Sequence, residues 1–157
     1  MSLVDRGSRP VGTGAQFRRC WRQVCEGAFP FLLDSALPGH PAARRSLAGS
    51  DPFLVVEVSG ERGRVFRGEN VEHVVSDAFE LLGRLCDEVR GEEVLGVGYL
   101  GYDLGGQIER LPRRAVDDQG FPELVFAFYD HWIEWDIDDG RSIRRGRGGL
   151  GPPVDAR

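Results

Sequence analysis

The chain has 157 residues, of which 41% are hydrophobic and 29% charged, with a formal net charge of −5 at pH 7. This length suits one domain with a sizeable core. All 20 Lys-or-Arg positions are Arg, which excludes lysine chemistry such as a Schiff base or a P-loop lysine. Residues 141–157 carry five Arg and one Asp, so the other 140 residues carry −9. Such an acidic body is a poor nucleic-acid binder.

The cysteines and the apolar runs indicate a cytoplasmic protein. Cys20, Cys25 and Cys86 form an odd, sparse set, which predicts free thiols in a reducing compartment. No window approaches the roughly 18 apolar residues that a membrane span needs. We therefore predict a cytoplasmic location and binding to neither membranes nor nucleic acid.

The first third of the chain predicts one helix and two strands. Residues 1–14 are rich in Gly, Ser and Pro and are predicted to be disordered. Residues 15–26 predict a short helix, because apolar side chains recur there at helical spacing. Residues 29–35 predict a strand that ends in the polar pair Asp34-Ser35, and residues 46–49 predict a second strand.

The middle of the chain predicts a hairpin and then a helix. Residues 53–58 and 64–67 flank a Gly-containing loop, as the strands of a hairpin do. Asn70 is expected to cap a helix over residues 71–89, whose apolar side chains form one stripe. Cys86 lies on that stripe, so we expect it to pack in the core.

The last third predicts further strands and a tail. Residues 94–100 predict a strand, and residues 123–138 predict one long bent strand or two strands, with the acids of residues 134–139 facing outward. Residues 140–157, rich in Arg, Gly and Pro, are predicted to be disordered, which leaves residues 15–139 as the folded domain. The strands cluster without regular alternation with helices, which predicts an α+β fold of mainly antiparallel sheets with flanking helices.

Gly96, Gly98 and Gly101 spell the dinucleotide-binding pattern G-x-G-x-x-G. That pattern requires a helix that opens within it and an acidic residue about 20 positions later at a strand end. Two more glycines and a proline follow instead, which leaves too little helix to point at a pyrophosphate. We predict that these glycines let another backbone or side chain approach the strand closely.

The remaining polar residues assemble no active site. The acidic run at residues 134–140 lacks the spacing of a calcium loop. His40, His73 and His131 are far apart in sequence and away from every Cys, so no metal site is expected. Ser35 is adjacent to Asp34 and close to His40, but this is not a triad arrangement, and no G-x-S-x-G motif is present.

Four segments, in this order, carry a resemblance to a known family. They are Leu-Leu-Asp-Ser-Ala at 32–36, Ser-Leu-Ala-Gly-Ser-Asp-Pro-Phe at 46–53, Gly-Tyr-Leu-Gly-Tyr-Asp at 98–103 and Phe-Ala-Phe-Tyr-Asp at 126–130. Together they resemble the N-terminal region of aminodeoxychorismate synthase component I and anthranilate synthase component I. The form GYLGYDLG…IERLP is more similar to the aminodeoxychorismate (para-aminobenzoate) branch. The resemblance spans about residues 29–136.

The resemblance implies a layered α/β/β/α sandwich and a pocket for an aromatic amino acid, tryptophan. The residues it assigns to that ligand-binding pocket are Leu33, Asp34, Ser35, Arg45, Ser46, Tyr99, Gly101, Tyr102 and Asp103. In the family, the chorismate site and its Mg²⁺ lie in a C-terminal domain outside the matched region. Two departures weaken the pocket: Arg45-Ser46-Leu47 stands where Tyr-Ser-Phe is usual, and Gly106 stands where Arg is frequent.

The resemblance therefore implies an N-terminal domain that is not catalytic by itself and serves folate or tryptophan biosynthesis. Its expected partners are a glutamine amidotransferase subunit or a separate chorismate-binding chain. A gene fragment is one expected origin. The alternative is a stand-alone module that senses tryptophan. The apolar run at residues 124–128 is expected to be left bare, and a bare sheet of this kind predicts a homodimer.

Overall fold

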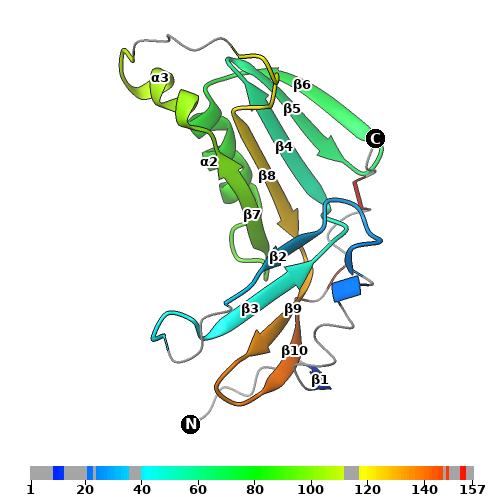
Figure 1. Ribbon diagram of the computed structural model, residues 1–157. Helices are drawn as coiled ribbons and strands as arrows, with labels where there is room; N and C mark the ends of the chain where they lie inside the picture. Colours follow the sequence, from blue (N-terminus) through cyan, green and yellow to red (C-terminus); the bar gives the residue numbers. More distant parts are fainter. Residues whose placement is uncertain are drawn as a thin grey trace.

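The computed structural model describes residues 9–12, 21–22, 24–35, 40–111, 117–146, 148 and 153–154. Within them, two five-stranded antiparallel sheets are joined end to end (Figure 1). Sheet A has the strand order β1 (Arg9–Gly12), β10 (Arg141–Gly146), β9 (His131–Asp136), β3 (Arg45–Gly49), β2 (Phe31–Leu33). Sheet B has the order β6 (Asn70–Val75), β5 (Arg62–Arg67), β4 (Leu54–Ser59), β8 (Leu124–Tyr129), β7 (Leu95–Leu100). The helices are α2 (Ala78–Glu88), the 3₁₀ turn η1 (Tyr102–Leu104) and α3 (Gly105–Ile108).

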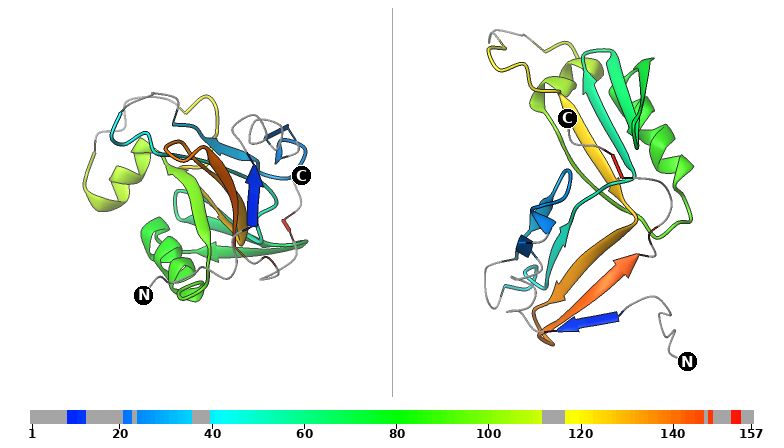
Figure 2. Two further views of the ribbon diagram at one scale, coloured as in Figure 1. Left: turned by 90° about the horizontal axis from the view of Figure 1, so that it is seen from below. Right: turned by 90° about the vertical axis from the view of Figure 1, so that its right-hand side faces the viewer.

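Two short crossings connect the sheets. Strand β8 leads into β9 through the single residue Asp130, and β3 leads into β4 through residues 50–53. The right-hand view of Figure 2 shows the sheets splayed at this junction. A small apolar cluster fills the junction, with Phe31 from sheet A packed against Val55, Ala127 and Tyr129 from sheet B.

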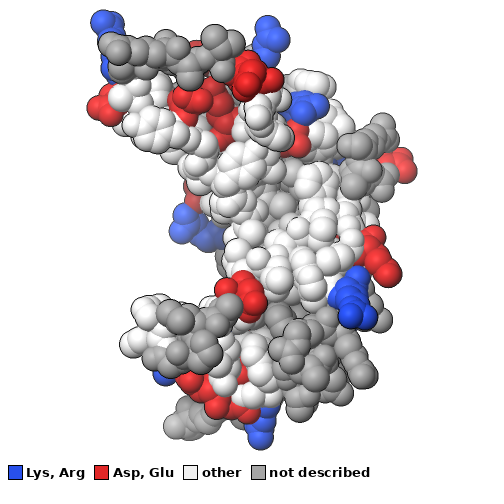
Figure 3. Space-filling view, viewed as in Figure 1, with Lys and Arg blue, Asp and Glu red and all other residues white. Residues whose placement is uncertain are grey.

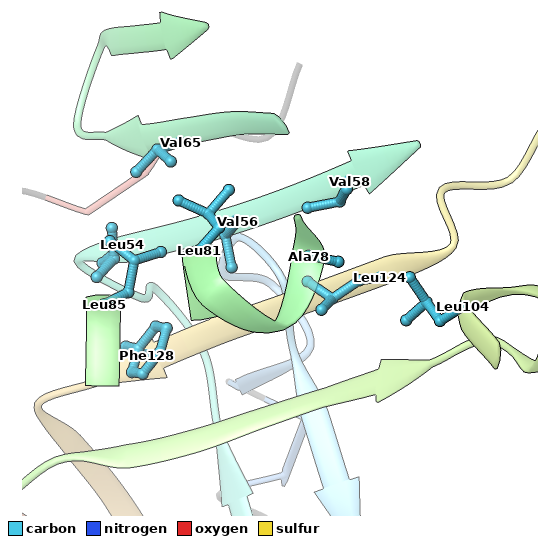
Figure 4. Packing of buried hydrophobic residues seen from close by; sticks show 10 residues of the cluster. All are labelled: Leu54, Val56, Val58, Val65, Ala78, Leu81, Leu85, Leu104, Leu124 and Phe128. Atoms are coloured by element: carbon cyan, nitrogen blue, oxygen red, sulfur yellow. The ribbon is translucent and has the colours of Figure 1, made fainter. Parts of the chain in front are cut away.

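Helix α2 covers one face of sheet B and forms the main core. Strand β4 carries valines on both faces, and Val56 and Val58 point toward the helix, where they meet Leu81 and Leu85 (Figure 4). These four side chains are at most 4% exposed. Burial of a side chain of this size stabilises the fold by about 1.5–3 kcal/mol, so sheet B and α2 form the best-packed part of the molecule.

The helix begins later than its sequence pattern predicted. Residues 70–75 form strand β6, and α2 begins at Ala78, after Asp77. The Asp77 carboxylate accepts hydrogen bonds from the backbone N–H groups of Phe79 and Glu80, so Asp77 rather than Asn70 is the cap. The β-branched valines of 71–75 suit a strand as well as a helix, and pairing with β5 decides between the two.

The expectation that Cys86 packs in the core is also wrong. Cys86 is exposed, as is Cys25, and both thiols are free. Only one sheet covers α2, so its buried stripe is narrow and consists of Ala78, Leu81 and Leu85. Cys86 lies one position further around the helix and faces solvent.

Strand β8 is buried, contrary to the expectation that residues 124–128 are bare. It lies between β4 and β7, and Leu124, Ala127 and Phe128 are at most 4% exposed. The neighbouring edge strand β7 carries exposed apolar side chains instead, with Tyr99 46% and Leu100 48% exposed. The bare surface therefore exists, but it belongs to the neighbouring strand.

The close approach predicted for the glycines is confirmed. A Cβ at Gly96 would lie 2.6 Å from the Phe126 ring, and one at Gly98 would lie 2.1 Å from the Val125 carbonyl oxygen. A Cβ at Gly101 would lie 2.9 Å from the Glu123 carbonyl oxygen. Strand β7 runs antiparallel to β8 and leads into a 3₁₀ turn, so the segment does not have the parallel β-α geometry of a dinucleotide site.

Regular structure extends into both ends of the chain that were predicted to be disordered. Strand β1 lies at Arg9–Gly12 and strand β10 at Arg141–Gly146. Six residue pairs join β10 to β9, and this pairing satisfies the backbone of a segment that has no apolar periodicity. Of the helix predicted at 15–26, Trp21, Arg22 and Val24 are helical, while residues 15–20 and 23 lie outside the described residues.

The other predicted elements are confirmed. They are strands β2, β3 and β7, the β4–β5 hairpin, and the two-strand alternative for residues 123–138. All eight described strand pairings are antiparallel, which agrees with the predicted α+β class. Within the part of the chain that is described, no helix is long and apolar enough to cross a bilayer.

Candidate functional site

The nine residues assigned to a ligand pocket lie in two separate groups. Leu33, Asp34, Ser35, Arg45 and Ser46 lie together at one end of the β2–β3 pair in sheet A. The other four lie at the end of β7 and in the turn that follows it. Leu100 there pairs with Leu124, the first residue of β8, whereas sheet A joins the opposite end of β8. Figure 1 shows this separation, with β7 ending beside α3.

A short hydrogen-bond relay organises the group in sheet A. The Ser35 N–H donates to Ser46 Oγ at 3.1 Å, and Ser46 Oγ donates to Asp34 Oδ1 at 2.8 Å. Ser35 Oγ in turn donates to the Arg45 carbonyl oxygen at 2.7 Å. Ser46 is 1% exposed, so this relay is largely structural. Both hydroxyl protons are used within the relay, while the Asp34 carboxylate remains exposed.

Arg45 belongs to a second polar cluster, which the sequence did not reveal. Its Nε lies 3.1 Å from Glu134 Oε1, and Arg145 Nε lies 3.1 Å from Glu134 Oε2. Glu134 is 6% exposed, which corrects the expectation that the acids of this strand face outward. Two guanidinium groups offset the burial of one carboxylate, as a buried charge requires. Arg45 and Ser46 are adjacent on a strand, so their side chains leave opposite faces of sheet A.

The second group surrounds an exposed turn. Tyr99 donates its hydroxyl to the Pro122 carbonyl oxygen at 3.0 Å, and the Gly101 N–H donates to the Glu123 carbonyl oxygen at 2.6 Å. Tyr102 is 89% exposed, and Asp103 is exposed beside it. Leu104, only 2% exposed, anchors the turn in the core. This group presents aromatic and acidic side chains to solvent rather than enclosing a cavity.

The face of sheet B that α2 leaves uncovered carries no charged side chain along β7 and β8, whereas Glu57, Arg62 and Arg64 lie on it along β4 and β5. In Figure 3 it forms a broad white area, hollowed between charged residues above and below. On this face the exposed apolar side chains of the strands are Val71 and Val75 at the β6 edge and Tyr99 at the β7 edge. Leu100 is exposed too, but it shares the α2 face with its partner Leu124. Exposed apolar side chains on an uncovered sheet face are typical of an interaction site in a folded protein.

The junction between the sheets holds buried polar groups of its own. Tyr129 is 2% exposed and donates its hydroxyl to the Phe29 carbonyl oxygen at 2.6 Å. Burial of the phenol, together with the charge of Asp51, raises the pKa of Tyr129 well above its ordinary value. Nearby, Asp130 is 4% exposed and lies 2.7 Å from the Nδ1 atom of His131. Across the described residues, no three His, Cys, Asp or Glu side chains gather as a metal site.

Comparison with known proteins supports the resemblance. No family model matches the chain. Anthranilate synthase component 1 of Acetivibrio thermocellus is 34% identical over 121 residues, which cover 71% of this chain and 24% of that protein. Its counterpart in Geobacillus stearothermophilus is 36% identical over 120 residues, which cover 64% of this chain and 23% of that protein. Aminodeoxychorismate synthase component 1 of Escherichia coli K12 is 26% identical over 108 residues.

The chain is a homologue of these component 1 proteins. It spans about a quarter of the length of the curated relatives it matches. Matches to both anthranilate and aminodeoxychorismate synthases leave the branch open, so the predicted leaning toward para-aminobenzoate stays a prediction. The assignment of the nine pocket residues stays a prediction too.

Proposed function

We propose that this chain is the N-terminal, non-catalytic part of a component 1-like synthase that uses chorismate for para-aminobenzoate or anthranilate formation. The chorismate-binding half, with its Mg²⁺, is supplied by further polypeptide or by a separate chain, and a glutamine amidotransferase subunit supplies ammonia. In this role the domain belongs to folate or tryptophan biosynthesis and acts in the cytoplasm. The observation that carries the proposal is the bare apolar face of sheet B in a chain that matches about a quarter of each relative.

The polar groups of the candidate site support a scaffold role. A nucleophilic serine needs a base that accepts its proton. Here Ser35 donates to a backbone carbonyl and Ser46 donates to Asp34 within the β2–β3 relay. Both hydroxyls therefore stabilise the conformation of the chain at the end of the β2–β3 pair. At the other end of the molecule, β7 offers one unpaired strand edge and exposed apolar side chains to a partner.

The first experiment measures turnover and association together. The purified chain is incubated with chorismate, ammonia and Mg²⁺, and we expect neither anthranilate nor aminodeoxychorismate. The C-terminal three-quarters of the Acetivibrio thermocellus component 1 is then added as a separate chain, and we expect a complex in size-exclusion chromatography. Conversion of chorismate by the chain alone would disprove the proposal.

A matched pair of variants locates the contact. Tyr99→Asp places a charge on the bare face and is expected to abolish the complex, since an unpaired charge is costly in an interface. Phe79→Asp is the control, because Phe79 is a partly exposed aromatic residue on α2, on the covered side of the sheet. Equal loss of binding in both variants would assign the effect to folding and not to the bare face. If the unmodified chain instead forms a homodimer that Tyr99→Asp disrupts, a second copy covers this face.

A tryptophan-binding module is the second candidate. The exposed Asp34 carboxylate lies beside Ser35, and Leu32 and Leu33 next to it are 37% and 49% exposed. A carboxylate that accepts an ammonium group, next to apolar surface, fits an aromatic amino acid. Calorimetry with tryptophan decides: a Kd near 1 μM, or about −8 kcal/mol, supports the module, and no heat up to millimolar tryptophan rules it out.

A further inference from the structure

A basic groove crosses β5 and β6 on the face of sheet B that α2 leaves uncovered. Arg64 pairs with His73 across these strands, and Arg62 pairs with Val75. Directly opposed residues share a face of an antiparallel sheet, and residues two apart on a strand share it too. Because Val65, between the two arginines, packs in the α2 core, the side chains of Arg62, Arg64 and His73 all leave the opposite face.

Two adjoining hollows lie over these side chains and share Arg64 and His73. The first has a volume of about 390 Å³ and is lined by the cationic Arg62 and Arg64, by His73 and by the hydroxyl of Ser59. No acidic side chain is among its described lining residues. The second, of about 350 Å³, adds the apolar side chains of Phe66 and Val71 together with two glutamates. One end of the groove is therefore cationic and the other is partly apolar.

The two arginines differ in what already holds them. Arg64 forms an ion pair with Glu57 at 2.5 Å, and its guanidinium lies 5.5 Å from the centre of the Phe66 ring. Arg62 is exposed, and it forms no ion pair with any other described residue. An unpaired guanidinium that opens into a hollow presents a fork of donors which matches a carboxylate or a phosphate. The surrounding chain is acidic, since residues 1–140 carry a formal net charge of −9.

We propose that this groove is a binding site for a small organic oxyanion, a carboxylate or phosphate carried on an apolar group of about the size of a benzene ring. Arg62 holds the oxyanion, and His73 and the Ser59 hydroxyl add donors beside it. The apolar group lies along Phe66 and Val71, where the second hollow is lined by hydrophobic side chains. Glu57 keeps Arg64 extended over Phe66, so that the floor of the groove is formed before a ligand arrives.

Phenyl phosphate and inorganic phosphate test the two halves of the site separately. Binding to the whole chain is followed at low ionic strength by calorimetry and by backbone amide shifts of β5 and β6. We expect phenyl phosphate to bind saturably and several-fold more tightly than inorganic phosphate. Val71→Ser, at a position 45% exposed, is expected to remove most of that preference. Absence of saturable binding of either probe would overturn the proposal.

Charge variants distinguish a site from general attraction. Arg62→Gln is expected to weaken phenyl phosphate binding by roughly tenfold, in line with loss of one charge-assisted hydrogen bond, and Arg62→Lys to weaken it less. Arg84→Gln is the control, because it removes the same charge from the exposed side of α2. If both glutamine variants lose affinity equally, the groove is not a site. Since every measurement uses this chain alone, failure here leaves the proposed role in a two-part synthase standing.

Discussion

The two sheets of this molecule are held together by different physical means. Sheet B and α2 enclose ten buried apolar side chains, which form one continuous cluster. Sheet A instead buries the polar side chains Ser46, Glu134 and Ser142. Ser46 hydrogen-bonds to Asp34 and Ser35, and Glu134 pairs with Arg45 of β3 and Arg145 of β10. Apolar burial tolerates small displacements, whereas a buried carboxylate needs its partners in place. Sheet B is therefore stabilised mainly by the apolar surface that it buries, and sheet A by the correct placement of a few buried polar side chains.

The largest expected effect tests the apolar sheet. Leu81→Ala removes a fully buried side chain between α2 and the strands, and we expect a loss of about 3 kcal/mol in the free energy of unfolding. Urea denaturation followed by circular dichroism measures it. Arg84→Ala on the exposed side of the same helix is the control and should change stability by less than about 0.5 kcal/mol. A loss below about 1 kcal/mol for Leu81→Ala would mean that this core is loosely packed.

A smaller effect is expected from the polar sheet. Glu134→Gln removes the charge that Arg45 and Arg145 share. Because Arg45 is 60% exposed at its side chain, solvent replaces part of the interaction, and we expect a loss of about 2 kcal/mol. Hydrogen exchange should show faster amide exchange in β9 and β10 while β4 and β8 keep their protection. Equal losses of protection in both sheets would remove the distinction between them.

Ser142→Ala is the matched control for that variant. The Ser142 hydroxyl is fully buried, and among the buried side-chain nitrogen and oxygen atoms of the described residues it is the one without a hydrogen-bond partner. A buried hydroxyl without a partner is destabilising, so its removal should leave stability unchanged or raise it by up to about 1 kcal/mol. If Ser142→Ala instead lowers the free energy of unfolding markedly, the Ser142 hydroxyl forms a hydrogen bond when the protein is in solution.

The smallest effect concerns alkaline pH and the junction between the sheets. Below about pH 10 the Tyr129 phenol is protonated in both the folded and the unfolded chain, so it adds no pH dependence. Above that pH the unfolded chain releases the proton while the folded chain retains it, because the folded pKa is raised by burial. Stability should then fall by up to about 1.4 kcal/mol per pH unit. Tyr129→Phe should remove this slope, and an unchanged slope would assign it to other groups.

The sequence predicted the sheet-rich fold well, and its errors have physical causes. Residues 70–75 fit a helical stripe and a strand equally, since periodicity over six residues with three valines cannot separate the two. Pairing with β5, a tertiary contact, made them a strand. Cys86 was misplaced because a helix covered by one sheet buries a narrower stripe than its apolar residues suggest.

The sequence of the C-terminal hairpin, β9 and β10, contains a turn dipeptide between its two strands. Asp139-Gly140 lies between the facing residues Asp136 and Arg141, and Asp-Gly between two strands is a strong hairpin indicator. Gly140 adopts φ +69° and closes the loop of residues 137–140, where a left-handed conformation favours glycine. Recognition of this turn would have placed Arg145 opposite β9 and would have pointed to a buried Glu134. The two-group division of the candidate site was not predictable, because it depends on which sheet each strand joins.

The joined sheets also determine how this molecule deforms. Chain continuity passes between them only at Asp130 and at residues 50–53 within the described segments. A backbone hydrogen bond from Phe53 to the Phe128 carbonyl oxygen, at 3.1 Å, holds these two crossings side by side. The Tyr129 hydroxyl and the Phe31 ring add contacts across the same junction, so the angle between the sheets is set where the two links and these contacts meet. A partner that contacts both sheets at the hollow in Figure 3 therefore meets two surfaces whose relative orientation depends on a few junction residues.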